Sequence, residues 1–552
     1  MTQTLAIAIA QINPALGDIA GNAERLKECR AIARDADLVV AGELVLTGYP
    51  PEDLVLKRIF QDHVEAAVGT LARATADGGP ALLIGAPWRV DGALRNAALL
   101  LDGGEIVAVT LKHELPNYGV FDEMRVFTPG PLPAPTVCRG VRLGVMVCED
   151  MWKPAVSRHL KEAGAEALVV INGSPFEIDK WGTRRGMAGD RVKETGLSLA
   201  YVNLVGGQDE LVFDGASFVL DSAGAFRVQA PSWRPALVKS LWRRGDGSVM
   251  SCDAGVVEPR AEGLEAIYLA MMVGLRDYVT KNRFPGVIIG LSGGIDSALT
   301  AAVAVDALGA ENVWCVMMPS RYTSQASLED AAEVARLLGA RLDTIGITPA
   351  MTAFNAMLAD VFADTLADTT EENIQARTRA VVLMALSNKF GHMLLTTGNK
   401  SEMSVGYATL YGDMSGGFSV LKDVYKSTVF ALSRWRNQTC PQDARGPAGR
   451  VIPERILSKA PSAELKDNQT DQDSLPPYDE LDAILGCLIE REASVAEIVE
   501  LGYEEATVRR VWRMIDRAEY KRRQAPPGVK ITYRAFGRDR RYPITNQFTD
   551  QI

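Results

Sequence analysis

The sequence predicts an α/β protein with more than one domain, on three observations. The chain has 552 residues, more than one hydrophobic core usually organises. Short apolar runs alternate with helical patterns through roughly its first 240 residues. Further along, a glycine-rich turn at 292–297 joins an apolar run to an alanine-rich helical pattern. Such alternation is typical of buried sheets covered by helices.

A polar stretch rich in turn-forming residues divides the chain. It includes Gly245 to Ser248 and Glu258-Pro259-Arg260, and we predict a linker over 246–262. The expected domains are therefore 1–245 and 263–552. In the second domain, the polar segment 461–477 is predicted to be an irregular loop that covers a substrate.

Composition narrows the classes of function. The chain is 47% hydrophobic and 23% charged, with a formal net charge of −10, so no nucleic-acid surface is expected. The run at 5–10 follows no basic leader and reads as a first strand, and no apolar stretch is long enough to cross a bilayer. Seven cysteines lack paired spacing, which disfavours zinc knuckles and disulfides. A cytoplasmic location without membrane or nucleic-acid partners is expected.

Three reactive side chains follow predicted strands of the first domain. Strand-like apolar runs occur at 37–40, 81–84, 106–109, 143–147 and 167–171. Glu43 follows the first of these runs, Lys112 the third and Cys148 the fourth. Open α/β folds place their sites at the carboxyl ends of strands, so these groups are predicted to meet.

A cysteine nucleophile needs a base that removes the thiol proton. The chain has four histidines, and none lies in a setting typical of a Cys–His pair, although His113 beside Lys112 stays open as an alternative. Glu43 can accept the proton, and Lys112 can stabilise both the thiolate and the oxyanion formed on an attacked amide.

The motifs around these residues resemble the nitrilase superfamily. They are Glu43-Leu44 with Thr47-Gly48-Tyr49-Pro50, Lys112 before Leu115-Pro116-Asn117-Tyr118, and Cys148-Glu149-Asp150-Met151-Trp152. The resemblance implies an αββα sandwich that hydrolyses carbon–nitrogen bonds, with Glu43 as general base, Lys112 as oxyanion stabiliser and Cys148 as nucleophile. Ala41-Gly42 replaces the Phe-Pro of many relatives, a departure that concerns local packing.

A further segment resembles the glutamine-holding part of glutaminase members of that superfamily. It runs from Asn172-Gly173-Ser174-Pro175-Phe176 to Lys180 and Arg184. By this resemblance Tyr118, Ser174 and Lys180 are the candidate glutamine-binding residues.

The glycine-rich turn of the second domain predicts a phosphate site. Gly286 to Leu291 reads as a buried strand and Ala298 to Leu308 as a helix. In Ser292-Gly293-Gly294-Ile295-Asp296-Ser297 the glycines permit close backbone approach and the helix N-terminus faces the anion. No lysine follows, so the loop is not of the Walker type. Its spacing matches loops of enzymes that adenylate a substrate with ATP and then displace AMP.

Three carboxylates on separate loops are candidates for Mg²⁺. Asp296 lies in the glycine-rich turn, Glu402 follows the strand-like run at 394–396, and Asp413 lies within 411–417. Oxygen ligands of this kind suit a hard cation that bridges ATP phosphates. Only folding can bring the three together.

The motifs of the second domain together resemble the NAD synthetases. They are 318–324, 371–377, 394–402, 411–417, Glu454 to Lys459, Pro461 to Leu465, Asp471, Leu475 to Asp479 and Tyr520-Lys521-Arg522. The resemblance implies a doubly wound parallel sheet of the ATP-pyrophosphatase type. With the nitrilase-like domain ahead of it, the whole chain resembles the glutamine-dependent form of that family, whose members form large homo-oligomers; we expect one here.

The resemblance also assigns residues to ligands. The residues assigned to ATP binding are Gly290, Leu291, Ser292, Gly293, Gly294, Ile295, Asp296, Ser297 and Thr397. The residues assigned to deamido-NAD binding are Asn373, Glu402 and Lys521. Those assigned to Mg²⁺ binding are Asp296, Glu402 and Asp413.

The implied reaction couples two sites. Glutamine is hydrolysed at the Glu43–Lys112–Cys148 site, and its ammonia passes through an internal tunnel to deamido-NAD adenylated by ATP. The products are NAD, AMP and pyrophosphate. Three alternatives remain: a ligase for a different acid, an amidohydrolase whose second domain only senses nucleotide, and a tRNA thiolase, which shares the loop but is disfavoured by the acidic composition.

Overall fold

The computed structural model describes residues 4–245, 249–546 and 548, and the chain divides into two compact units, Met1–Ala261 and Glu262–Ile552. Of the predicted linker 246–262, residues 246–248 lie outside the described residues. Met250–Cys252 within it forms a strand, β15, in which Met250 and Cys252 are buried and Ser251 is exposed. This alternation covers only three residues, which is too short to predict from sequence.

The first unit contains two large sheets and a small hairpin. One sheet has the order β15-β14-β1-β2-β3-β4-β5, with β1 Thr4–Gln11, β2 Leu38–Ala41, β3 Ala81–Val90, β4 Ala93–Asp102, β5 Glu105–Leu111 and β14 Ala236–Arg244. The other has the order β13-β12-β9-β8-β7-β6, with β6 Thr136–Cys138, β7 Val141–Val147, β8 Ala167–Asn172, β9 Leu199–Asn203, β12 Phe218–Leu220 and β13 Phe226–Gln229. The hairpin pairs β10 Val205–Gln208 with β11 Leu211–Asp214.

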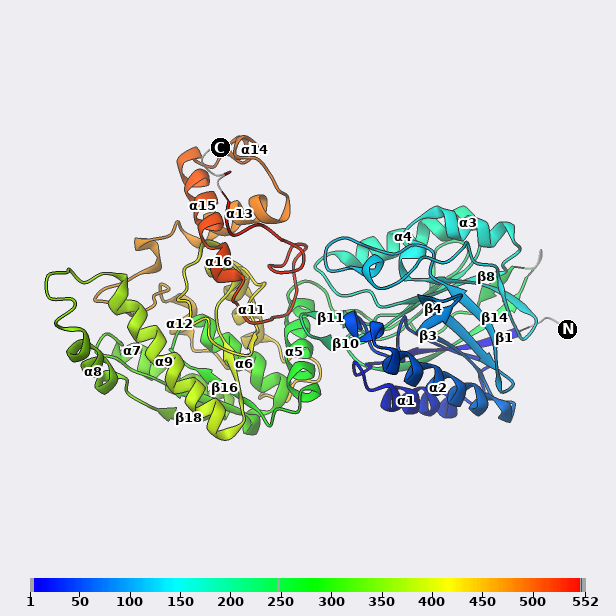
Figure 1. Cartoon of the computed structure of the whole chain (residues 1–552), viewed down its shortest axis with the longest axis horizontal. Helices are drawn as coiled ribbons and strands as arrows, with labels where there is room; N and C mark the ends of the chain where they lie inside the picture. The colour runs from blue at the N-terminus through cyan, green and yellow to red at the C-terminus, as the bar shows by residue number, and fades with distance from the viewer. Residues whose placement is uncertain (1–3, 246–248, 547, 549–552) are drawn as a thin grey trace. The chain divides into compact units, whose positions relative to one another are not determined.

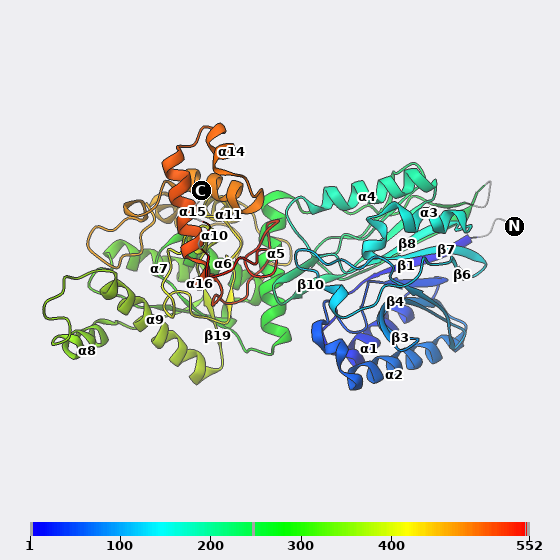
Figure 2. The same ribbon diagram turned by 45° about the horizontal axis from the view of Figure 1, so that its top comes forward.

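These sheets and four helices form an αββα sandwich. A shared apolar core joins β1 residues such as Ile7 and Ile9 to Val145 and Val169 of the opposite sheet. Helices α1 (Ile19–Ile32) and α2 (Arg58–Ala74) cover the first sheet, and α3 (Pro154–Glu162) and α4 (Lys180–Thr195) cover the second (Figures 1 and 2). The predicted fold of the first unit is confirmed.

The second unit is built on a parallel sheet with the order β18-β17-β16-β19-β20. Its strands are β16 Val287–Gly290, β17 Val313–Met317, β18 Arg341–Thr344, β19 Met393–Thr396 and β20 Phe418–Ser419. Helices α6 (Ile295–Leu308) and α7 (Gln325–Leu338) follow β16 and β17, whereas α8 (Thr348–Leu358) and α9 (Thr369–Phe390) connect β18 to β19. Leu383 of α9 packs on Ile288 and Leu394, so this crossover covers the face of the sheet that carries those residues. The doubly wound parallel sheet is confirmed.

The remaining helices complete the second unit. They are α5 Gly263–Lys281, α10 Lys400–Val405, α11 Lys426–Gln438, α12 Glu454–Ser458, α13 Tyr478–Leu485, α14 Val495–Glu500, α15 Glu505–Arg517 and α16 Glu519–Arg522. Residues of α10, α13, α14 and α15 share one apolar cluster. In the part of the chain that is described, no helix is long and apolar enough to cross a membrane.

Candidate active sites

In the first unit, three strand ends deliver Glu43, Lys112 and Cys148. Glu43 follows β2, Lys112 directly follows β5, and Cys148 begins a short 3₁₀ turn, Cys148–Met151, after β7. The side chains of Glu43 and Lys112 are fully buried, and Cys148 is 4% exposed. Two different sheets thus contribute reactive groups to one water-poor site.

The Glu43 carboxylate is held by three donors. Oε1 accepts from Lys112 Nζ at 2.6 Å and from Asn96 Nδ2 at 2.8 Å, and Oε2 accepts from the Gly173 N–H at 2.9 Å. A Cβ at Gly173 would lie 2.9 Å from the Tyr49 ring, so this close approach needs a glycine. Glu43 therefore has a single, well-determined position.

A second carboxylate, Glu123, belongs to the same cluster and was not predicted. Glu123 Oε1 accepts from Lys112 Nζ at 2.8 Å and from the Tyr49 hydroxyl at 3.0 Å. Burial raises the pKa of Glu123 to about 7, although the Lys112 ammonium acts in the opposite direction. Glu123 lies in a polar segment among Asp122 and Arg125, where the sequence offers no strand end or motif to mark it.

The electrostatics of the cluster keep the thiol neutral at rest. Burial, reinforced by the Glu43 carboxylate, raises the pKa of Cys148, while Lys112 opposes that shift. Burial also disfavours the charged form of Lys112, but Glu123 and Glu43 outweigh it and raise the pKa of this ammonium. The arrangement provides a thiol, a neighbouring carboxylate base and a permanently charged ammonium.

The predicted glutamine-binding residues have different settings. The half-exposed Tyr118 donates its hydroxyl to Glu149 Oε2 at 2.9 Å. Ser174 is buried, and its Oγ accepts from Arg184 Nε at 3.0 Å. The Lys180 ammonium lies 5.6 Å from the centre of the Phe121 ring.

The His113 ring, the alternative base, is held by a backbone carbonyl. Its Nδ1 lies 2.7 Å from the carbonyl oxygen of Gly130. This contact fixes one ring nitrogen of His113 on the backbone.

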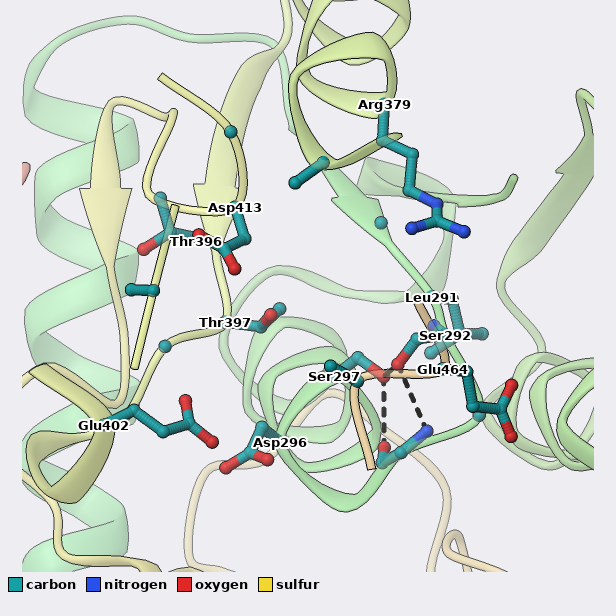
Figure 3. A pocket seen from close by; sticks show the side chains of 18 of the residues that line it. Leu291, Ser292, Asp296, Ser297, Arg379, Thr396, Thr397, Glu402, Asp413 and Glu464 are labelled. Carbon is teal, nitrogen blue, oxygen red and sulfur yellow. Dashed lines mark hydrogen bonds between the residues drawn. The ribbon is translucent and has the colours of Figure 1, made fainter. Parts of the chain in front are cut away.

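In the second unit, the predicted phosphate loop borders a cavity of about 300 Å³. Its lining includes Gly290 to Ser297, Thr397, Glu402 and Asp413, all predicted site residues (Figure 3). Gly293 has φ +79°, and a Cβ there would lie 2.3 Å from the Ser327 carbonyl oxygen, so the loop requires glycine.

Hydrogen bonds fold the loop onto the start of α6. Ser297 Oγ accepts the Ser292 N–H at 3.2 Å, lies 3.0 Å from Ser292 Oγ and donates to the Gly294 carbonyl at 3.0 Å. The first turn of α6 thereby borders the cavity, where unpaired N–H groups and the helix dipole favour an anion.

Two predicted metal ligands share a lysine. Lys426 Nζ bonds to Asp296 Oδ2 and lies 3.1 Å from Glu402 Oε1. Figure 3 shows the Asp296 and Glu402 carboxylates pointing toward one another. Burial raises the pKa of Glu402 to about 8 against the effect of Lys426. A cation close to the Asp296 and Glu402 carboxylates would therefore stabilise their charged form.

Asp413 lies apart from that pair. It accepts the Thr409 N–H at 2.7 Å, and burial raises its pKa to about 6. Within the described ranges, no three His, Cys, Asp or Glu side chains are already arranged around a metal position.

Asn373 and Lys521 do not line the cavity but support its wall. Asn373 Oδ1 accepts the Thr409 hydroxyl at 2.8 Å. Lys521 Nζ donates to the carbonyls of Gly406 and Ala408, each at 2.7 Å. Both residues thus hold the 406–413 segment, which carries Asp413.

Several lining residues were not predicted: Arg379, Lys426, Lys459, Glu464 and Asp471. Glu464 accepts from Ser324 Oγ at 2.9 Å and from Ser327 Oγ at 2.7 Å, which attaches the 461–477 loop to the start of α7. Arg379 points from α9 toward the glycine-rich loop (Figure 3). Lys459, Glu464 and Asp471 lie within motifs described in the sequence analysis. Arg379 and Lys426 lie outside those motifs, and only their charge could have marked them as site residues.

Comparison with known families defines the class of enzyme. Residues 6–240 match the carbon-nitrogen hydrolase family model, and residues 267–525 match the NAD synthase model. The two units therefore make a carbon–nitrogen ligase that carries its own amide-hydrolysing part.

Full-length relatives identify the family. The chain is 52% identical to the glutamine-dependent NAD(+) synthetase of Rhodobacter capsulatus, over all of both chains. It is 47% identical to that of Xanthomonas campestris pv. campestris, over 99% of this chain and 98% of the relative. The structure of the Acinetobacter baumannii glutamine-dependent NAD+ synthetase, in complex with ADP, matches with TM-score 0.78 and 42% identity over 99% of each chain. The chain belongs to the glutamine-dependent NAD(+) synthetases.

Proposed function

We propose that residues 1–245 hydrolyse glutamine at Cys148 and that residues 263–552 use the resulting ammonia to amidate deamido-NAD. The observation that carries this proposal is the buried Lys112–Glu43 contact of 2.6 Å, with both charged groups close enough to Cys148 to act on the pKa of its thiol. Such a set suits attack on an unactivated amide, because a base, a nucleophile and a fixed cation are already in place.

In the first half-reaction, Glu43 takes the Cys148 proton as the sulfur attacks the glutamine amide carbon. Lys112 stabilises the oxyanion, and the proton returns to the leaving nitrogen as ammonia departs. Water then hydrolyses the thioester to glutamate. Tyr118, Ser174 and Lys180 bind glutamine in this proposal.

In the second half-reaction, the carboxylate of deamido-NAD attacks the α-phosphate of ATP and pyrophosphate leaves. Ammonia then attacks the acyl carbon of the adenylate, which gives NAD and AMP. The loop Gly290 to Ser297 and Thr397 hold ATP, with the α6 N-terminus facing its phosphates. Asn373, Glu402 and Lys521 contribute to the deamido-NAD site.

Asp296, Glu402 and Asp413 would hold Mg²⁺. The raised pKa values of Glu402 and Asp413 support this assignment, because a divalent cation stabilises buried carboxylates in their charged form. When bound, Mg²⁺ would neutralise charge on the ATP phosphates.

Ammonia is expected to move between the sites without entering bulk water, where it would be mostly protonated near neutral pH. Isotope transfer from amide-labelled glutamine, with unlabelled ammonium in competition, tests this channelling. Full dilution of the label in NAD would contradict it.

The division of labour is tested by Cys148→Ala, assayed with glutamine and then with ammonium. Glutamine-dependent synthesis should be lost and ammonia-dependent synthesis retained. Asp296→Ala is the complementary variant and should lose synthesis with either nitrogen source. Loss of both reactions in a folded Cys148→Ala protein would contradict the proposal.

A further inference from the structure

One buried carboxylate, Asp150, connects the segments that carry Lys112 and Cys148. Its Oδ1 accepts the backbone N–H groups of His113 at 3.0 Å and Glu114 at 2.8 Å. Its Oδ2 accepts the Val147 N–H at 3.0 Å. Asp150 is fully buried, so water does not compete for these bonds. The donors directly follow Lys112 and directly precede Cys148.

The connection matters because the two reactive residues come from different sheets. Lys112 follows β5, the last strand of the seven-stranded sheet, and Cys148 follows β7 of the six-stranded sheet. Sheets that pack through apolar side chains define their separation only within the tolerance of that packing. Directional hydrogen bonds from one carboxylate to both segments define it more closely.

The backbone at Cys148 also needs support. Its φ of +47° lies in the left-handed region, which costs energy for a residue with a side chain. Asp150 lies in the same turn and accepts the N–H of the residue before Cys148. The bond therefore helps to hold the conformation that presents the sulfur to the cluster.

Other contacts between these segments are weaker. Tyr118 donates to Glu149 Oε2 at 2.9 Å, but its side chain is half-exposed. Lys153 and Glu114 form an ion pair of 2.7 Å in which the lysine is largely exposed. Exposed pairs of this kind contribute little, so the buried Asp150 bonds dominate the connection.

We propose that Asp150 is a positioning residue of the glutaminase reaction, which sets the placement of Lys112 relative to the Cys148 sulfur. This inference rests on the proposed roles of Cys148 and Lys112. Asp150 acts through its three backbone bonds and does not contact glutamine.

The test is Asp150→Asn in the full-length enzyme. The variant keeps the size of the side chain but places an NH₂ group where at least one backbone N–H needs an acceptor. We expect the glutamine-dependent kcat to fall on the order of 10- to 100-fold. The KM for glutamine should change little, and ammonia-dependent synthesis should not change.

A second measurement separates positioning from simple loss of stability. The rate of iodoacetamide alkylation at Cys148, followed by mass spectrometry across pH, reports how Lys112 supports the thiolate. In Asp150→Asn this profile should move to higher pH, because the ammonium is less well placed. Hydrogen exchange in β5 and β7 verifies that the unit is folded. An unchanged kcat and alkylation profile in the folded variant would overturn the inference.

The matched control is Glu114→Gln, which removes the exposed ion pair between the same two segments but keeps the Glu114 N–H. Its kcat and alkylation profile should stay within twofold of the unsubstituted enzyme. If Asp150→Asn does not fold, Asp150→Glu replaces it, because this variant keeps the charge but displaces the carboxylate. The same lower kcat and shifted alkylation profile are then expected, and their absence would overturn the inference. Survival of glutamine-dependent synthesis in Cys148→Ala would instead refute the proposed function itself.

Discussion

The two units each contain a buried lysine between two carboxylates, and the surroundings of the two lysines differ. Lys112 Nζ lies 2.6 Å from Glu43 and 2.8 Å from Glu123, whose side chains are 0% and 7% exposed. Lys426 bonds to Asp296 and Glu402, whose side chains are 17% and 16% exposed and border the cavity of about 300 Å³.

This difference suggests different uses of the same ionic arrangement. Around Lys112 the side chains are almost completely buried, so its ion pair with Glu43 does not depend on a bound ligand. Around Lys426 the carboxylates border the cavity, so under the proposed function a cation bound with ATP would take over part of the role of the lysine. The first site is therefore complete in the folded chain, whereas the proposed function adds ATP and a cation to the second.

The largest expected effect comes from Lys112→Met. Removal of the ammonium leaves Glu43 and Glu123 buried without their cation, which should lower the free energy of unfolding of the first unit by about 3–5 kcal/mol. Glutamine-dependent synthesis should be lost. Hydrogen exchange of β5 and β7 peptides in urea measures the stability change, and a loss below about 1 kcal/mol would contradict a permanent ion cluster.

A smaller effect is expected from the titration of Glu123. Burial raises the pKa of Glu123 to about 7 in the folded protein, above the ordinary glutamate value of 4.5. The folded state therefore binds more protons between these values, and its stability falls as pH rises through this window. Glu123→Gln should remove this slope. The free energy of unfolding of the unsubstituted unit minus that of the variant should fall as the pH rises from 4.5 to 7, and a constant difference would contradict the raised pKa of Glu123.

The smallest effect is expected from Lys426→Met, at about 1–2 kcal/mol, because its carboxylates can be hydrated from the cavity. Millimolar Mg²⁺ should raise the melting temperature of this variant more than that of the unsubstituted protein, since a divalent cation can replace the lost ammonium. Thermal melts with and without Mg²⁺ measure this. Equal Mg²⁺ effects on both proteins would remove the distinction between the two sites.

Local sequence patterns predicted the elements that carry the sites. The run at 143–147 lies in β7 and the run at 286–291 contains β16, because apolar stretches of strand length bury themselves in a sheet. The glycine-rich turn joins β16 to α6 as predicted, but α6 begins at Ile295, three residues before the predicted start at Ala298, so Ile295 to Ser297 lie in its first turn. The strand β15 was not predicted, because its alternation of buried and exposed residues covers only three positions.

The sequence by itself therefore determined the strands, their polar ends and the motifs of both units, since these depend on residues close along the chain. Tertiary structure alone decided that Glu123 joins Lys112, that Lys426 lies between Asp296 and Glu402, and that Asp150 links two sheets. The physical reason is that charge pairing within a core depends on which distant segments pack together. A lysine or an aspartate has the same local pattern on a solvated surface as in such a cluster.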